Sequence, residues 1–90
     1  MDKPIRLSIH ARGQLRSRGV SDQEIVEAIR TAPWTRAASG KLECRKNFEY
    51  NQEWNKKWYS TKQVRPIFVD EKEEIIVVTV YSYYFQEAPK

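Results

Sequence analysis

The stretch VSDQEIVEAIRTAP, residues 20–33, has the clearest local structure in the chain. Ser21 and Glu24 are spaced as a capping box, in which each side chain accepts a hydrogen bond from the backbone N–H of the other residue. Apolar residues then recur at helical spacing from Ile25 to Ala32. Pro33 cannot continue a helix. The stretch therefore predicts a helix that starts after Ser21 and ends before Pro33.

The residues before this helix predict two further elements. Apolar and polar residues alternate over Ile5–Ile9, which favours a short leading strand. His10–Arg18 has helical spacing of its apolar residues, and Gly19 follows it at the position where glycine commonly ends a helix. Two short helices joined at Gly19 are therefore expected.

The residues after the loop at 33–40 switch to a period of two, which is typical of a strand with one buried face. The buried face should include Cys44, and the polar face should be open to solvent or to a ligand. The first set is Leu42, Cys44, Lys46, Phe48 and Tyr50, and the second is Lys41, Glu43, Arg45, Asn47 and Glu49.

Further strands are predicted on both sides of a charged turn at 70–73. Residues 51–57 suit a hairpin connection, and residues 58–70 suit one or two strands in which Pro66 favours a sheet edge or a bulge. Residues 74–85 are apolar on both faces from Ile75 to Val80, which predicts a central strand. Tyr81, Tyr83 and Phe85 should share one face of it. The whole chain, residues 1–90, is expected to form a single α+β domain: two N-terminal helices on a curved antiparallel sheet of three to four strands.

Composition excludes several classes of function. The single cysteine and the single histidine cannot form an internal disulfide or a structural zinc site, and no phosphate loop or dinucleotide-binding motif is present. No metal or cofactor is therefore expected. The first nine residues lack the apolar stretch of a signal peptide, so a cytoplasmic protein without a membrane segment is expected.

Positive charge is unevenly distributed along the chain, whose net charge is +4. Residues 1–18 carry five basic groups and one acidic group, and residues 36–65 carry eight basic and three acidic groups. Such a distribution favours contact with phosphates if the fold brings the two stretches together. The alternative is a solvated surface with scattered lysines and arginines.

Two stretches resemble the RelE/ParE/BrnT toxin superfamily, particularly its members of unknown function. They are residues 10–21, which include His10, LRSRG and Val20-Ser21, and the pair RPIFV (65–69) and IVVTVY (76–81). The resemblance extends over roughly residues 8 to 85 and implies a RelE-like fold. It implies a small toxin that cleaves RNA without a metal ion, often on the ribosome, and that pairs with an antitoxin protein. ParE-type relatives inhibit gyrase instead. Many members have an arginine four residues after the histidine, where this chain has Gln14.

Metal-free RNA cleavage requires a base, a cation and an acid. With one histidine in the chain, the candidates are His10, Arg65, Glu43 and Tyr81. Histidine is the residue type best suited to proton transfer at neutral pH, and an arginine fixed on a strand suits a phosphate. Each has an alternative: His10 as a helix-terminal hydrogen-bonding residue, Arg65 in an ion pair with Glu43 or Glu49, and Tyr81 in the core.

Candidate RNA-binding residues are basic or aromatic: Arg16, Arg18, Arg45, Trp54, Lys56 and Lys57. Trp58 is expected in the core, while Trp54 is either a cover for the turn or a stacking residue. The leading hypothesis is a metal-independent endoribonuclease whose candidates converge in one basic hollow. The alternative is a non-catalytic RNA- or protein-binding module on the same fold, in which these groups are dispersed or Arg65 is held in an ion pair away from His10.

Overall fold

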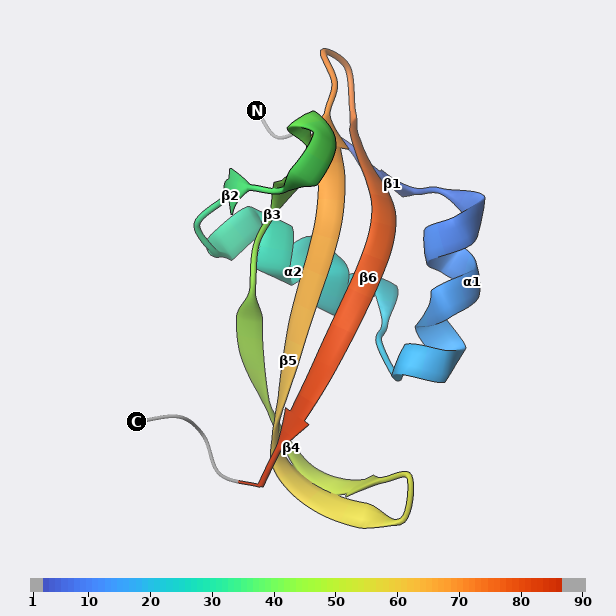
Figure 1. Cartoon of the computed structure of the whole chain (residues 1–90), viewed down its shortest axis with the longest axis vertical. Coiled ribbons are helices and arrows are strands. Elements are labelled where there is room, and N and C mark those ends of the chain that lie inside the picture. Colours follow the sequence, from blue (N-terminus) through green and yellow to red (C-terminus); the bar gives the residue numbers. More distant parts are fainter. Residues whose placement is uncertain (1–2, 87–90) are drawn as a thin grey trace.

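The computed structural model describes residues 3–86, so residues 1–2 and 87–90 of the predicted domain lie outside it. The chain is an α+β protein, as predicted, in which two helices accompany one twisted sheet (Figure 1). In chain order the elements are β1 (Ile5–Leu7), α1 (Ile9–Arg18), α2 (Asp22–Thr31), β2 (Thr35–Arg36), the short 3-10 helix η1 (Ala38–Gly40), β3 (Leu42–Glu43), β4 (Lys46–Trp54), β5 (Lys57–Asp70) and β6 (Ile75–Phe85).

The expected sheet of three to four antiparallel strands is wrong in number and in direction. Within the described residues the sheet has six strands in the order β1-β6-β5-β3-β2, and β4 pairs with β5 beside β3. β1 runs parallel to β6, so the sheet is mixed. β2 is only two residues long, which is too short for an alternating pattern to reveal. β3 and β4 together correspond to the single strand predicted through Cys44, which is interrupted in the structure.

β5 rather than β6 is the central strand. β5 pairs with β6 along one edge and with β3 and then β4 along the other. Among the described strands, β6 has a second neighbour only over Ile75–Val77, where β1 lies beside it. Only the first half of the apolar run that predicted a central strand, Ile75–Val77, therefore has a strand on each side.

Pro66 lies inside the central strand, so the prediction of a sheet edge is wrong there. Its carbonyl accepts a hydrogen bond from the Cys44 N–H over 3.4 Å. The N–H and C=O groups of one residue in an antiparallel ladder point to the same side. The missing N–H of Pro66 therefore faces the break between β3 and β4, where no ladder donor is required. A register shift between β5 and β6 follows at Ile67/Phe68, where the extra residue is Val78, so the irregularity beside Pro66 lies in the partner strand.

Both predicted helices form and end where expected, and α1 begins at Ile9, one residue before its predicted start. Ser8 caps α1 by accepting from the Ala11 N–H, and Gly19 ends it in the left-handed region at φ 68°. Ser21 and Glu24 form the predicted capping box of α2. α2 ends at Thr31, before Pro33.

One face of the sheet forms the core. α2 lies behind β5 and β6 in Figure 1, and α1 lies beside β6. Cys44 is 2% exposed, which confirms its predicted place in the core. The buried apolar residues are Leu7, Ala11, Val20, Ile25, Ala28, Ile29, Cys44, Val64, Phe68, Ile75, Val77 and Val80.

Candidate functional site: an arginine and tyrosine cluster on the open face

The face of the sheet opposite the helices carries polar and aromatic side chains, and we call it the open face. Val64 and Phe68 of β5 are buried under the helices, so the residues that alternate with them, including Arg65, point the other way. Arg65 pairs with Tyr81 of β6, and paired residues share a face. The expected alternation of Tyr81 and Tyr83 against Tyr84 is confirmed, because the Tyr84 hydroxyl reaches α1 on the helix side.

Arg65 is the centre of the open face. Its Nη2 donates to Glu43 Oε1 over 2.7 Å, and its Nε donates to Glu43 Oε2 over 3.3 Å. Its Nη1 donates to the Tyr83 hydroxyl over 3.1 Å. Three strands, β3, β5 and β6, therefore each contribute one side chain to a single hydrogen-bonded group.

This geometry decides the charge of both partners. The Arg65 hydrogen bond holds the pKa of the Glu43 carboxyl below its usual range, and the Glu43 hydrogen bond raises the pKa of Arg65. The Glu43 side chain is 12% exposed, and both of its oxygens accept from the same guanidinium. Glu43 is thus a carboxylate at neutral pH and has little tendency to accept a proton.

Tyr81 lies between two guanidinium groups. The Cζ atoms of Arg18 and Arg65 are 5.2 and 5.3 Å from its ring centroid. Arg65 approaches from β5. Arg18 approaches from α1, which borders the other edge of β6, where the Val80 N–H donates to Gln14 Oε1 over 2.9 Å. Both are cation–π contacts.

Arg45 adds a third positive charge to this region. Its Nε lies 3.8 Å from Glu43 Oε2, and its side chain is largely exposed. We call this group the Arg65 cluster: Arg18, Glu43, Arg45, Arg65, Tyr81 and Tyr83. Its three arginines and one glutamate carry a net charge of +2. Arg18 makes no ion pair with any residue between 3 and 86, so its charge is available to a ligand.

Of the four predicted catalytic residues, the structure brings Glu43, Arg65 and Tyr81 together and leaves His10 apart. His10 is exposed in the first turn of α1, whereas Arg18 is in its last turn. Eight residues of helix separate their backbones by about 12 Å along the axis. The Arg65 cluster therefore contains a cation and hydroxyl groups but no imidazole.

The candidate RNA-binding residues separate into different places. Arg18 and Arg45 belong to the Arg65 cluster. Lys56 and Lys57 are exposed at the β4–β5 turn, where Asn55 and Lys56 adopt positive φ angles of 51° and 69°. Arg16 is exposed on α1, at the rim of a hollow beside the turn between the helices.

The structure overturns the expectation for Trp58 and decides between the alternatives left open for Trp54, which packs within the protein near the turn. Trp58, expected in the core, is 50% exposed. The Trp54 ring instead stacks on Tyr84 at 5.0 Å between centroids, and Tyr50 and Tyr59 also pack on Tyr84. The strand curls strongly near the hairpin, after an irregularity between Glu49 and Gln52, and alternation no longer predicts which side is buried.

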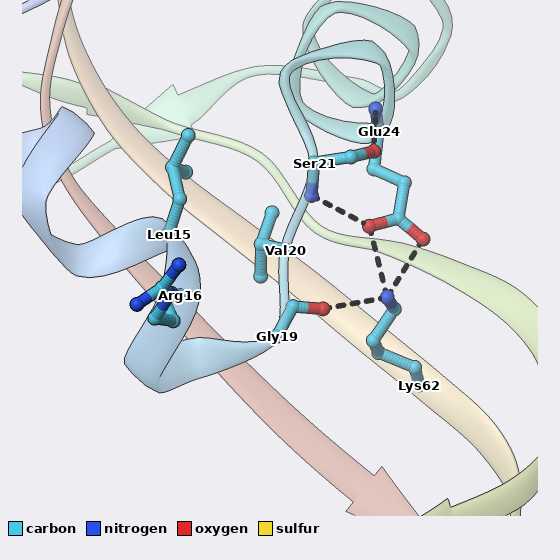
Figure 2. Close-up of a pocket in the computed structure, with 7 residues that line it drawn as sticks. All are labelled: Leu15, Arg16, Gly19, Val20, Ser21, Glu24 and Lys62. Carbon is cyan, nitrogen blue, oxygen red and sulfur yellow. Dashed lines mark hydrogen bonds and ion pairs between the residues drawn. The ribbon is translucent and has the colours of Figure 1, made fainter.

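Sequence reasoning missed a buried lysine. Lys62 lines a hollow of about 540 Å³ with residues of the α1–α2 turn (Figure 2). Its Nζ donates to the Gly19 carbonyl over 2.8 Å and lies 2.8 and 2.9 Å from the two Glu24 oxygens. These partners satisfy the ammonium group, so Lys62 has a structural role. The available signal was a lysine two residues before Val64, and therefore on the same buried face of the strand.

Amide groups extend the open face beyond the Arg65 cluster and were not singled out from the sequence. Gln63 precedes Arg65 by two residues on β5, and its Nε2 donates to Asn47 Oδ1 over 3.0 Å. Gln63 also pairs with Tyr83. The open face thus continues from arginine and tyrosine to amide side chains.

Within residues 3–86 no helix is long and apolar enough to cross a membrane. In the same part of the chain no three histidine, cysteine, aspartate or glutamate side chains are grouped to hold a metal ion. Comparison of the chain with protein-family models, with curated proteins and with solved structures finds no match.

Proposed function

We propose that this chain is a non-catalytic RNA-binding domain whose open face binds a single strand. The observation that supports this most directly is the Arg65 cluster, in which three arginines and two tyrosines gather on a sheet face that neither α1 nor α2 covers. Arginines combined with exposed aromatic rings are typical of surfaces that bind unpaired nucleotides. The resemblance to RelE-like toxins remains a hypothesis, and the Arg65 cluster supports RNA binding without it.

Individual residues of the cluster have distinct roles in this proposal. Arg18 and Arg45 contact phosphates, because Arg18 has no ion pair among the described residues and Arg45 is exposed. Tyr83 stacks on a base, since its side chain is exposed and its hydroxyl is fixed by Arg65. Tyr81 already has a guanidinium group on each side, so it separates the two arginines rather than stacking on a base.

The two candidate general bases, Glu43 and His10, are poorly placed for cleavage, which favours a binding function. A general base must accept the proton of the 2′-hydroxyl. Glu43 is a poor base because Arg65 occupies both of its oxygens and lowers its pKa. His10, the other candidate, lies at the far end of α1.

The second candidate function is a metal-independent endoribonuclease of toxin–antitoxin type, acting on RNA or on the ribosome. It is favoured by the meeting of Glu43, Arg65 and Tyr81 at one place. Cleavage would require Arg65 to leave Glu43 for the phosphate of the substrate, which would free the carboxylate. An antitoxin protein would be the expected partner in that case.

The test is fluorescence anisotropy with a labelled single-stranded RNA of about 12 nucleotides, compared with single-stranded DNA and duplex RNA. Arg18→Ala should weaken RNA binding about tenfold, because it removes a phosphate contact. Arg12→Ala removes the same charge from an exposed position of the same helix and should change binding less than about twofold. Two phosphate contacts predict a slope of log K against log salt near −1.4.

The same samples distinguish the two candidates. Incubation of the RNA with chelator and analysis on a denaturing gel should show intact strands. New 5′ ends that disappear in Glu43→Gln would establish cleavage and overturn the non-catalytic proposal. No binding to any of the three nucleic acids would overturn both.

A further inference from the structure

Two side chains of strand β6 donate hydrogen bonds to one backbone carbonyl group in the last turn of α1. The Arg18 carbonyl oxygen accepts from Ser82 Oγ over 2.7 Å and from the Tyr84 hydroxyl over 2.6 Å. The last carbonyls of a helix have no partner within the helix. Since a carbonyl oxygen has two lone pairs, the two hydroxyls together satisfy it.

The Tyr84 hydroxyl is well suited to this contact. Burial is the main reason why its pKa rises to about 12, so the phenol keeps its proton and remains a donor at neutral pH. Its ring is fixed by the stacked Trp54 and by Tyr50 and Tyr59. The donor is therefore held in position before it meets α1.

Arg18 connects this contact to the opposite face of the sheet. Its backbone carbonyl is bound on the helix side of β6, whereas its guanidinium lies 5.2 Å from the Tyr81 ring. Successive residues of a strand point to opposite faces, so Tyr81 lies on the open face, and Ser82 and Tyr84 do not. The position of the Arg18 backbone decides where its side chain can reach.

We propose that Ser82 and Tyr84 are positioning residues, which act on the open face by holding Arg18 where its guanidinium reaches both Tyr81 and a bound phosphate. The part of this proposal that concerns a bound phosphate rests on the proposed function. The placement of Arg18 beside Tyr81 is a property of the free protein and is tested without RNA.

The first experiment therefore uses the free protein. Nuclear Overhauser effects between the Arg18 side chain and the Tyr81 ring should be present in the unmodified chain and lost in Ser82→Ala/Tyr84→Phe, which removes two oxygen atoms and keeps every ring. Tyr50→Phe removes a hydroxyl from the same aromatic group, but that hydroxyl contacts Glu53 rather than Arg18, so the effects should persist. Retained effects between the Trp54 ring and the aromatic ring at position 84 show that each variant is folded. Unchanged Arg18–Tyr81 contacts in the double variant would overturn the proposal.

The second experiment measures RNA affinity in a mutant cycle. Ser82→Ala/Tyr84→Phe should weaken binding about fivefold and make the salt slope shallower by about 0.7, the value for one phosphate contact with a single strand. In the Arg18→Ala background the same pair should have no further effect. Ser82→Thr, which keeps a hydroxyl, should retain most of the affinity. Additive losses would show that Ser82 and Tyr84 do not act through Arg18.

The two experiments fail separately. If the unmodified chain binds no RNA, the proposed function is wrong, and the contacts of the free protein still decide whether Ser82 and Tyr84 position Arg18. If RNA binds and the Arg18–Tyr81 contacts are unchanged in the double variant, the positioning role of Ser82 and Tyr84 is wrong, while the proposal that the open face binds RNA is unaffected.

Discussion

The Nζ atom of Lys62 lies 2.8 Å from the carbonyl oxygen of Gly19, so the central strand is hydrogen-bonded to the turn between the two helices. Glu24, which caps α2, accepts from the same ammonium group. One side chain of β5 therefore joins the end of α1 to the start of α2.

Replacing Lys62 should destabilise the protein strongly. Its side chain is 7% exposed, and Lys62→Met would leave Glu24 without its cation. We expect the free energy of unfolding to fall by about 2–3 kcal/mol, measured by urea denaturation. Lys57→Met, at an exposed position of the same strand, should change it by less than about 0.5 kcal/mol. Equal losses in both variants would contradict the structural role of Lys62.

Gly19→Ala should be much more harmful than Gly13→Ala. Gly19 has a φ of 68°, and an added Cβ would lie 2.5 Å from the Tyr84 hydroxyl and 2.6 Å from the Trp54 ring. We expect a loss of at least about 2 kcal/mol. A Cβ at Gly13 meets nothing within 4 Å in a helix, so Gly13→Ala should gain about 0.5–1 kcal/mol. Thermal unfolding followed by circular dichroism measures both, and equal shifts would argue against the close packing at Gly19.

The two tryptophans near the hairpin should differ in their effects on stability. Trp54→Ala removes a ring stacked on Tyr84 and should cost about 2–3 kcal/mol. Trp58 is half exposed, so Trp58→Ala should cost less than about 1 kcal/mol. Acrylamide quenching in Trp54→Phe and Trp58→Phe provides an independent check. Trp58 should be quenched more easily than Trp54, so fluorescence should be less sensitive to acrylamide in Trp58→Phe than in Trp54→Phe.

The Cys44 thiol should not react in the folded protein. Burial raises its pKa to about 11 from an ordinary value of 9.0. A thiol reagent at about pH 8 should label it only after urea is added. Because the folded pKa is raised, the stability that this protonated thiol contributes is present below pH 9.0 and is lost as the pH rises towards 11. Cys44→Ala should show a smaller loss over that range. Rapid stoichiometric labelling without urea would contradict the buried position.

The Glu43–Arg65 pair should stabilise the protein above the unfolded pKa of Glu43 and not in acid. The Arg65 hydrogen bond lowers the folded pKa from 4.5, so the stabilisation is lost as the pH falls below that value. At neutral pH, Glu43→Gln should cost about 1–2 kcal/mol. The difference from the unmodified chain should shrink towards zero in urea titrations at low pH. A difference that does not change with pH would show that the ion pair contributes nothing.

The helices were predictable because their signals are local. Ser21 and Glu24 form a capping box within four residues, and Gly19 supplies a left-handed cap that the sequence pattern alone indicates. The alternation through Cys44 also survives the break between β3 and β4, because both strands pair with the same neighbour, β5.

The sheet was harder to predict because its pairing is long-range. β1 is three residues long and pairs with residues 75–77, about seventy positions away. Nothing local to Ile5–Leu7 indicates a parallel partner. Trp58 was misplaced for a related reason, since the curl of the hairpin changes which side of the strand faces the core.

The candidate site was predictable in its residue types but only in part in its arrangement. Glu43, Arg65 and Tyr81 were chosen from the sequence, and they meet on three adjacent strands. His10 is separated from the cluster by the length of α1, whose last turn is held against β6 by the contact at the Arg18 carbonyl. That contact joins residues more than sixty positions apart.

Pro66 and the break opposite it divide one edge of the central strand into two lengths. β3 pairs with β5 on one side of the break and β4 on the other, and Cys44 and Arg45 belong to neither strand. Backbone amides on the two sides should therefore exchange with solvent deuterium in two separate opening events. We expect the end that carries β2 and β3 to open while the end that carries β4 stays closed, which would divide a single edge of this small sheet into two cooperative units.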